Sequence, residues 1–158
     1  MANRFAAALV GGAAGAITLT ALHQILKRVT ADAPRADNLG KQALRKAIRA
    51  TGSTPPSDDK LQWGALAGDL AANTAYYSIG LAFGPGPAKW LGPLLGAGAG
   101  AGSVALPGAL GLEPGETGRT QTTKMLAFGL YLAGGIAATA TYRALIDGDG
   151  ESGLTRHA

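Results

Sequence analysis

Four long segments of the chain are almost free of charged residues, and polar segments separate them. They cover residues 5–26, 61–83, 90–112 and 125–146. A helix needs about 20 mostly apolar residues to cross the ~30 Å hydrocarbon core of a bilayer. The pattern predicts an all-α, multi-pass membrane protein with four transmembrane helices, and a soluble bundle of buried helices is the alternative. We assign residues 1–146 to one membrane domain and predict a disordered tail, acidic and rich in glycine, over residues 147–158.

Glycine is abundant in these segments, with 25 residues in a chain of 158. In the third segment, glycines at positions 96, 98, 100 and 102 form two overlapping G-x-x-x-G patterns that point in nearly opposite directions. Small residues four apart let helix backbones approach closely in a membrane, so we expect neighbouring helices on both sides. A phosphate-binding loop is disfavoured because no strand precedes the glycines and no G-K-[ST] follows them. The sequence therefore predicts a glycine-rich four-helix bundle.

The loop between the first two spans contains a short amphipathic helix, predicted over residues 38–51. Lys41, Arg45, Lys46 and Arg49 share one face of it, and small apolar residues share the other. Such a helix can lie in the membrane interface and attract anionic lipid headgroups, or it can merely cover the mouth of the bundle. Candidate residues for binding anions or lipid headgroups, taken from this helix and from the flanking loops, are Arg35, Lys41, Arg45, Arg49, Arg119 and Lys124.

The distribution of positive charge predicts the orientation. Ten of the 14 Lys and Arg residues lie in the loop between spans one and two or in the loop between spans three and four. The positive-inside rule places both loops in the cytoplasm and both termini outside, in a bacterial cytoplasmic (inner) membrane. The basic residues are not interleaved with aromatic ones, so topology explains them better than nucleic-acid binding does.

The sequence contains few of the residue types that carry catalysis or bind metals. Cysteine is absent and only two histidines are present, which excludes thiolate sites and leaves no histidine cluster. No nucleophile-base-acid arrangement, metal-ligand spacing or phosphate loop occurs. We therefore predict no catalytic residue, no metal site and no cofactor.

A group of polar residues is predicted in the cytoplasmic half of the bundle, around Asp69. A charge near the middle of a membrane helix costs roughly 2.5–3.5 kcal/mol on insertion scales, so it usually faces other helices or water. Helical rise places Thr20, Asp69 and Tyr131 at similar depths, ~9–12 Å from the cytoplasmic ends of their spans. The candidate polar site consists of Thr20, His23, Asp69, Asn73, Tyr76, Tyr77 and Tyr131.

Three sequence patterns resemble those of small uncharacterised bacterial membrane proteins. They are H-x4-R at His23 and Arg28, A-P-R-x-D-x-L-G over residues 33–40, and the stretch from Trp63 to Asp69, which ends in L-A-G-D. The resemblance covers most of the chain. It implies a fold of four helices in the inner membrane and implies no activity.

Three functions are compatible with these patterns. We favour a non-enzymatic membrane bundle that contacts lipids and associates with a second copy or another membrane protein. The first alternative is a channel or proton-linked transporter that uses Asp69 and its neighbours. The second is an enzyme that modifies a lipid or isoprenoid on the cytoplasmic side, with acid-base groups and phosphate-binding cations. The residues for that enzyme would be His23, Asp37 and Asp69, with Arg35, Arg119 and Lys124.

Overall fold

The computed structural model describes residues 4–154, with side chains from residue 4 to residue 147, and this part of the chain is helical with no strand. Residues 1–3 and 155–158 lie outside the described residues. The six helices are α1 (Arg4–Val29), α2 (Ala36–Ala50), α3 (Asp58–Ala82), α4 (Pro85–Ala109), α5 (Gly115–Gly118) and α6 (Gln121–Leu154). The all-α prediction is therefore confirmed.

The four predicted spans correspond to α1, α3, α4 and α6, and the predicted amphipathic helix corresponds to α2. α4 begins earlier than predicted, because Gly84 adopts a φ of 108° and Pro85 occupies the first helical position, where no amide donor is required. α6 runs to Leu154 and so continues into the segment for which the sequence predicts disorder. The rest of that segment, residues 155–158, lies outside the described residues.

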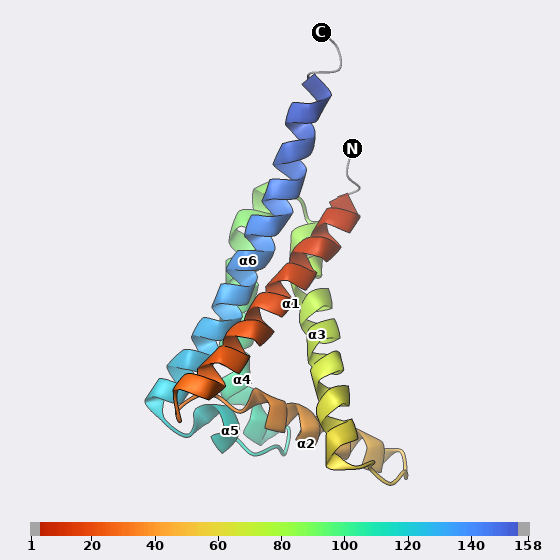
Figure 1. Ribbon diagram of the computed structural model, residues 1–158, viewed down its shortest axis with the longest axis vertical. Helices are drawn as coiled ribbons and strands as arrows, with labels where there is room; N and C mark the ends of the chain where they lie inside the picture. The colour runs from red at the N-terminus through yellow and green to blue at the C-terminus, as the bar shows by residue number, and fades with distance from the viewer. Residues whose placement is uncertain (1–3, 155–158) are drawn as a thin grey trace.

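The four long helices form an elongated body, and α2 and α5 lie across one end of it (Figure 1). We call this the α2 end. α1 packs against α3 on one side and against α6 on the other, while α6 also packs against α4. The first residues of α1 and the last residues of α6 lie at the opposite end (Figure 1).

Glycine makes the contacts between the long helices possible. A Cβ atom added to Gly15 would lie 2.6 Å from the carbonyl oxygen of Gly134, and one added to Gly96 would lie 2.5 Å from that of Tyr131. Side-chain atoms do not approach a backbone oxygen this closely, so α1 and α4 can reach α6 only with glycine at these positions. Many of the buried apolar residues are alanines, and the largest fully buried side chains include Tyr77 and Tyr142.

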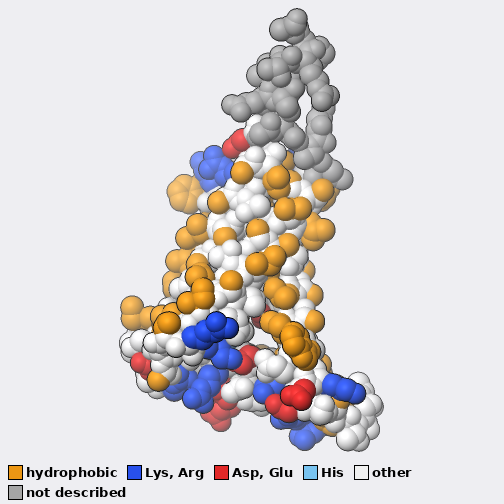
Figure 2. All heavy atoms as spheres, viewed as in Figure 1, with side chains coloured by type: hydrophobic (Ala, Val, Ile, Leu, Met, Phe, Trp, Pro, Cys, Tyr) orange, Lys and Arg blue, Asp and Glu red, His pale blue; other side chains and the backbone are white. Residues whose placement is uncertain are grey.

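Large apolar side chains point outward along the whole length of the body (Figure 2). Ile17 is 61% exposed, Ile79 is 64% exposed and Leu94 is 65% exposed. This distribution is the reverse of that in a soluble helical bundle, where large aliphatic side chains fill the core. The charged side chains gather mainly at the α2 end (Figure 2).

By length and composition, two helices of the described chain could cross a membrane. They are Arg4–Val29 and Gln121–Asp147, and the core helix of a soluble protein or a signal sequence can meet the same criterion. α3 falls short because Asp69, Asn73 and other polar residues lower its hydropathy, while α4 gains little hydropathy from its many glycines. The structure therefore supports two helices that could cross a membrane, and four transmembrane helices stay a prediction.

Candidate functional site

A small polar cavity lies near the α2 end, between α1, α2, α3 and α6. Its volume is about 50 Å³, which is room for one or a few water molecules. α1 contributes Thr20 and His23, α2 contributes Asp37, α3 contributes Asp69 and α6 contributes Tyr131. Four of the seven residues of the predicted polar site thus line one cavity, although they come from three separate helices.

A larger groove of about 550 Å³ lies between α3 and α4, at the same end of the molecule. α3 and α4 touch near Gly80 and Leu95, close to the loop that joins them, and the groove separates them farther along. α2 closes the groove at the α2 end through Leu39 and Ala43. Asp69 and Tyr131 line both the groove and the polar cavity, so they form the wall between the two.

The groove explains why α4 carries two glycine stripes. Gly96 and Gly100 face the α6 backbone. Gly98 and Gly102 line the groove, where a Cβ atom on Gly98 would meet only the Tyr76 hydroxyl, at 3.7 Å. The prediction that helices pack against both sides of α4 is therefore wrong for the second stripe, which borders open space.

The Asp69 carboxylate has one hydrogen-bond partner within the described chain. Asn73 donates from Nδ2 to Asp69 Oδ1 at 2.9 Å and also to the Asp69 carbonyl oxygen at 3.0 Å. Since the two residues are one helical turn apart on α3, this contact is local. No described Lys or Arg forms an ion pair with Asp69.

His23 connects the cavity to the α1–α2 loop. Its Nε2 donates to the Pro34 carbonyl oxygen at 2.7 Å. Asp37 accepts a hydrogen bond from Lys27 at 2.7 Å. Burial opposes ionisation of Asp37, but the hydrogen bond and charge of Lys27, with the nearby His23, outweigh it and lower the pKa of this carboxyl.

Two buried oxygen atoms on the cavity-lining residues have no hydrogen-bond partner in the described chain. They are Thr20 Oγ1 and Asp37 Oδ1. Buried polar atoms in proteins are almost always satisfied, often by internal water. The polar cavity is therefore suited to hold water between Thr20, His23 and the two carboxylates.

The two remaining tyrosines of the predicted site, Tyr76 and Tyr77, each form a hydrogen bond to another helix. Tyr77 is fully buried and donates to the Tyr131 carbonyl oxygen at 2.8 Å, so it ties α3 to α6 and reaches neither cavity. Tyr76 lines the groove and donates to the Leu95 carbonyl oxygen at 3.1 Å. Asn73 also lines the groove.

Above the cavity, toward the chain termini, the bundle is tightly closed. Tyr77, Leu81, Ala138 and Tyr142 pack together there with no measurable exposure. Both the polar cavity and the groove are thus confined to the half of the molecule near α2.

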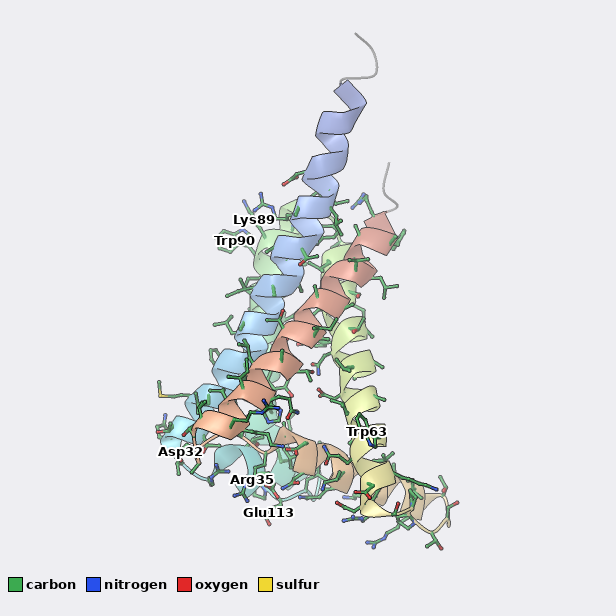
Figure 3. The ribbon with its side chains drawn as sticks, viewed as in Figure 1. Asp32, Arg35, Trp63, Lys89, Trp90 and Glu113 are labelled. Carbon is green, nitrogen blue, oxygen red and sulfur yellow. The ribbon has the colours of Figure 1, made fainter. Side chains whose placement is uncertain are left out.

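The basic residues proposed to bind anions do not converge. Arg119 donates to the carbonyl oxygens of Ala31 and Ala33, the latter at 2.9 Å, and so holds the α1–α2 loop. Arg35 lies at the α2 end of the molecule (Figure 3). Its backbone amide donates to the Glu116 carbonyl oxygen at 2.7 Å. Lys124 borders a separate hollow between α4 and α6.

Two of these candidates meet on α2. Arg45 and Arg49 line a shallow hollow of about 340 Å³ together with Lys46, which the sequence reasoning left out of the candidate site. Lys46 donates to the Leu110 carbonyl oxygen at 2.6 Å. Arg45 shares Asp58 with Lys41, each at 3.0 Å. Lys41 and Arg45 are thus paired with a carboxylate, whereas Lys46 contacts a backbone carbonyl.

The sequence reasoning missed the groove-lining residues of α2 and α4, which include Ala43, Gly98 and Ser103. The second glycine stripe was visible in the sequence, but nothing in its spacing tells a helix contact from an open groove. The described residues contain no group of three or more His, Cys, Asp or Glu that could hold a metal ion.

Comparisons of the chain with protein-family models, with curated proteins and with solved structures find no match. The resemblance to small bacterial membrane proteins therefore stays a prediction.

Proposed function

We propose that this chain is a four-span protein of the bacterial cytoplasmic membrane that binds a hydrophobic chain in the groove between α3 and α4, without catalysing a reaction. Both termini lie outside, and α2 and α5 lie on the cytoplasmic side. The observation that carries the proposal is the groove itself. It has about 550 Å³ of space, walls made mostly of Ala, Gly and Leu, and a position inside the band of outward-facing apolar side chains.

The exposed side chains support the membrane part of the proposal. Soluble proteins rarely expose apolar patches larger than a few hundred Å², yet large apolar residues cover the part of this body between the charged α2 end and the residues drawn in grey (Figure 2). Trp63 and Trp90, which are 72% and 71% exposed, lie near opposite ends of the body (Figure 3). Indole rings prefer the two membrane interfaces. The two tryptophans thus mark the two edges of the apolar band, where a bilayer would have its interfaces with water.

The volume and lining of the groove support binding of a hydrophobic chain. Sites for small molecules typically measure about 300–1,000 Å³ and are mostly apolar with a few polar groups. Inside a bilayer, an apolar groove between two helices is filled by whatever chain can enter from the side. Gly98 and Gly102 keep this space open, because any larger side chain there would project into it.

The alternatives receive less support from the same geometry. A channel or transporter needs a path toward the outer side, but Tyr77, Leu81 and Tyr142 close the bundle there. A lipid-modifying enzyme needs cations beside its acid-base groups, but Arg119 is bound to loop carbonyls and Lys124 borders a separate hollow between α4 and α6.

Photolabelling tests the proposal. The protein is reconstituted in vesicles with a neutral long-chain alcohol that carries a diazirine, and labelled peptides are identified after irradiation. We expect labelling of the α3 and α4 segments that line the groove, and its loss in Gly98→Leu. Gly129→Leu is the matched control, because Gly129 has open space around it and lies on α6 away from the groove.

Equal labelling of the groove segments in wild type and in Gly98→Leu would refute the proposal. Absence of labelling in the groove segments of the wild-type protein would also refute it, because it would mean that no hydrophobic chain enters the groove.

A further inference from the structure

The groove contains a carboxylate that the protein does not pair with a cation. Asp69 Oδ1 accepts from Asn73, while Asp69 Oδ2 has no partner among the described residues. Oδ2 is not sealed within the protein, so it is accessible from the cavity or the groove. Asp69 is half-buried, and a carboxylate that has lost part of its hydration is normally compensated by a partner, because leaving water without compensation is costly.

Among the described residues, His23 is the only basic side chain that lines the polar cavity or the groove. No Lys or Arg lines the groove or the polar cavity in the described chain. This histidine belongs to α1, and its Nε2 donates a hydrogen bond to the Pro34 carbonyl oxygen, not to Asp69. On α2, Asp37 is acidic and already paired with Lys27.

The nearby hydroxyl groups do not replace a cation either. Tyr76 donates to the Leu95 carbonyl oxygen, and Ser103 on α4 donates to the Gly100 carbonyl oxygen at 2.8 Å. Tyr131 of α6 lines both cavities and is the remaining titratable group there. A phenol can share a proton with a carboxylate, but it brings no positive charge.

We infer that the groove selects an amphiphile with a positively charged ammonium group, which pairs with Asp69 while its hydrophobic chain lies between α3 and α4. This inference rests on the proposed function, since it names the chemical class of the groove's ligand. The ammonium group supplies the positively charged partner that the Asp69 carboxylate lacks. The aromatic rings of Tyr76 and Tyr131 line the same groove, and such rings attract a nearby cation. The apolar walls exclude a small hydrated cation in favour of one attached to a chain.

An anionic amphiphile is disfavoured by the same charge. Its headgroup would face Asp69 inside the groove, where like charges repel strongly because little water screens them. The basic hollow formed by Arg45, Lys46 and Arg49 on α2 lies outside the groove and can attract anionic lipid separately. Binding of cations and binding of anions therefore depend on different residues.

Three probes with one chain length separate these contributions. They are dodecyltrimethylammonium, dodecanol and dodecyl sulfate, each radiolabelled and kept below its micellar concentration, with binding measured on full-length protein in a neutral detergent. The wild-type protein is compared with Asp69→Asn, which removes the charge and keeps the shape. Asp59→Asn is the matched control, since Asp59 is an exposed carboxylate on the same helix.

We expect Asp69→Asn to weaken binding of dodecyltrimethylammonium by about 30-fold or more, as removal of one partner of a buried charge pair usually does. Dodecanol binding should change little, and Asp59→Asn should match wild type with all three probes. Thermal unfolding of each variant checks that it is folded, and Asp69→Glu, which keeps the charge, should retain a preference for the cation if Asn at this position impairs folding.

Unchanged cation binding in folded Asp69→Asn would overturn the inference, and so would tighter wild-type binding of dodecyl sulfate than of dodecyltrimethylammonium. Gly98→Leu distinguishes this failure from failure of the proposed function. If Gly98→Leu abolishes binding of dodecanol but charge has no effect, the groove binds chains without selecting cations. If Gly98→Leu affects no probe, the groove is not a binding site.

Discussion

Tyr77 and Tyr142 provide a direct test of how this bundle is held together. Both side chains are fully buried, but their hydroxyl groups differ. The Tyr77 hydroxyl donates to the Tyr131 carbonyl oxygen at 2.8 Å, whereas the Tyr142 hydroxyl has no partner in the described chain. Replacing each by phenylalanine removes one oxygen atom and leaves the packing of the ring unchanged. The same substitution should therefore have opposite effects at the two positions.

The expected free energies follow from the hydrogen bonding. Tyr77→Phe loses one interhelical hydrogen bond, which contributes about 0.5–1.5 kcal/mol in proteins and about 0.6 kcal/mol on average between membrane helices. The Tyr131 carbonyl keeps its helical environment, so no isolated acceptor is created. Tyr142→Phe removes a buried hydroxyl without a partner, whose burial costs about 1–3 kcal/mol. We expect Tyr77→Phe to be less stable than Tyr142→Phe by about 2 kcal/mol, the sum of the lost bond and the relieved burial cost.

The free energy of unfolding of the two variants and of the wild type can be measured in mixed micelles with increasing dodecyl sulfate. Tyr77→Phe should unfold at lower dodecyl sulfate than wild type, and Tyr142→Phe at equal or higher dodecyl sulfate. Equal destabilisation by both substitutions would refute the reasoning, because it would mean that the Tyr142 hydroxyl also has a partner in the folded protein.

Three further predictions concern packing, charge and the loop at the α2 end. Gly15→Val should prevent close packing of α1 on α6 and lower the thermal unfolding midpoint sharply, because its Cβ atom would lie 2.6 Å from a backbone oxygen of α6, whereas Gly129→Val should be nearly neutral. The pKa of Asp37 is lowered in the folded state, so its ion pair with Lys27 stabilises the protein above the unfolded pKa of about 3.9 and is lost as the pH falls through the folded value. Lys27→Met should reduce this loss of stability on acidification, which unfolding measured between about pH 7 and pH 3 would detect. Arg119→Gln should remove the hydrogen bonds that hold the carbonyl groups of Ala31 and Ala33, so backbone amides of the loop between α1 and α2 should exchange hydrogen faster while those of α6 do not.

The charge-poor apolar runs determined which segments form the long helices. Apolar runs of membrane length predicted four long helices near their observed positions, and the basic face of α2 predicted the short amphipathic helix. The α4 start was less predictable, since Gly84 and Pro85 are typical of a turn, and only the positive φ of Gly84 places Pro85 at the first helical position. Helices can be located from neighbouring residues alone, because their backbone hydrogen bonds join residues four apart.

Only the tertiary structure decided what lies between the helices. The sequence placed Thr20, Asp69 and Tyr131 at similar depths, but depth does not specify how each helix is rotated. Tyr77 lies on the same face of α3 as Asp69, yet its hydroxyl forms an interhelical hydrogen bond and does not line a cavity. The two glycine stripes of α4 are nearly identical in sequence. Gly96 meets α6 while Gly98 borders the groove, because α3 contacts α4 near Tyr76 and Gly80 and the groove separates the two helices farther along. Such differences depend on contacts between residues distant in the chain, which no local pattern records.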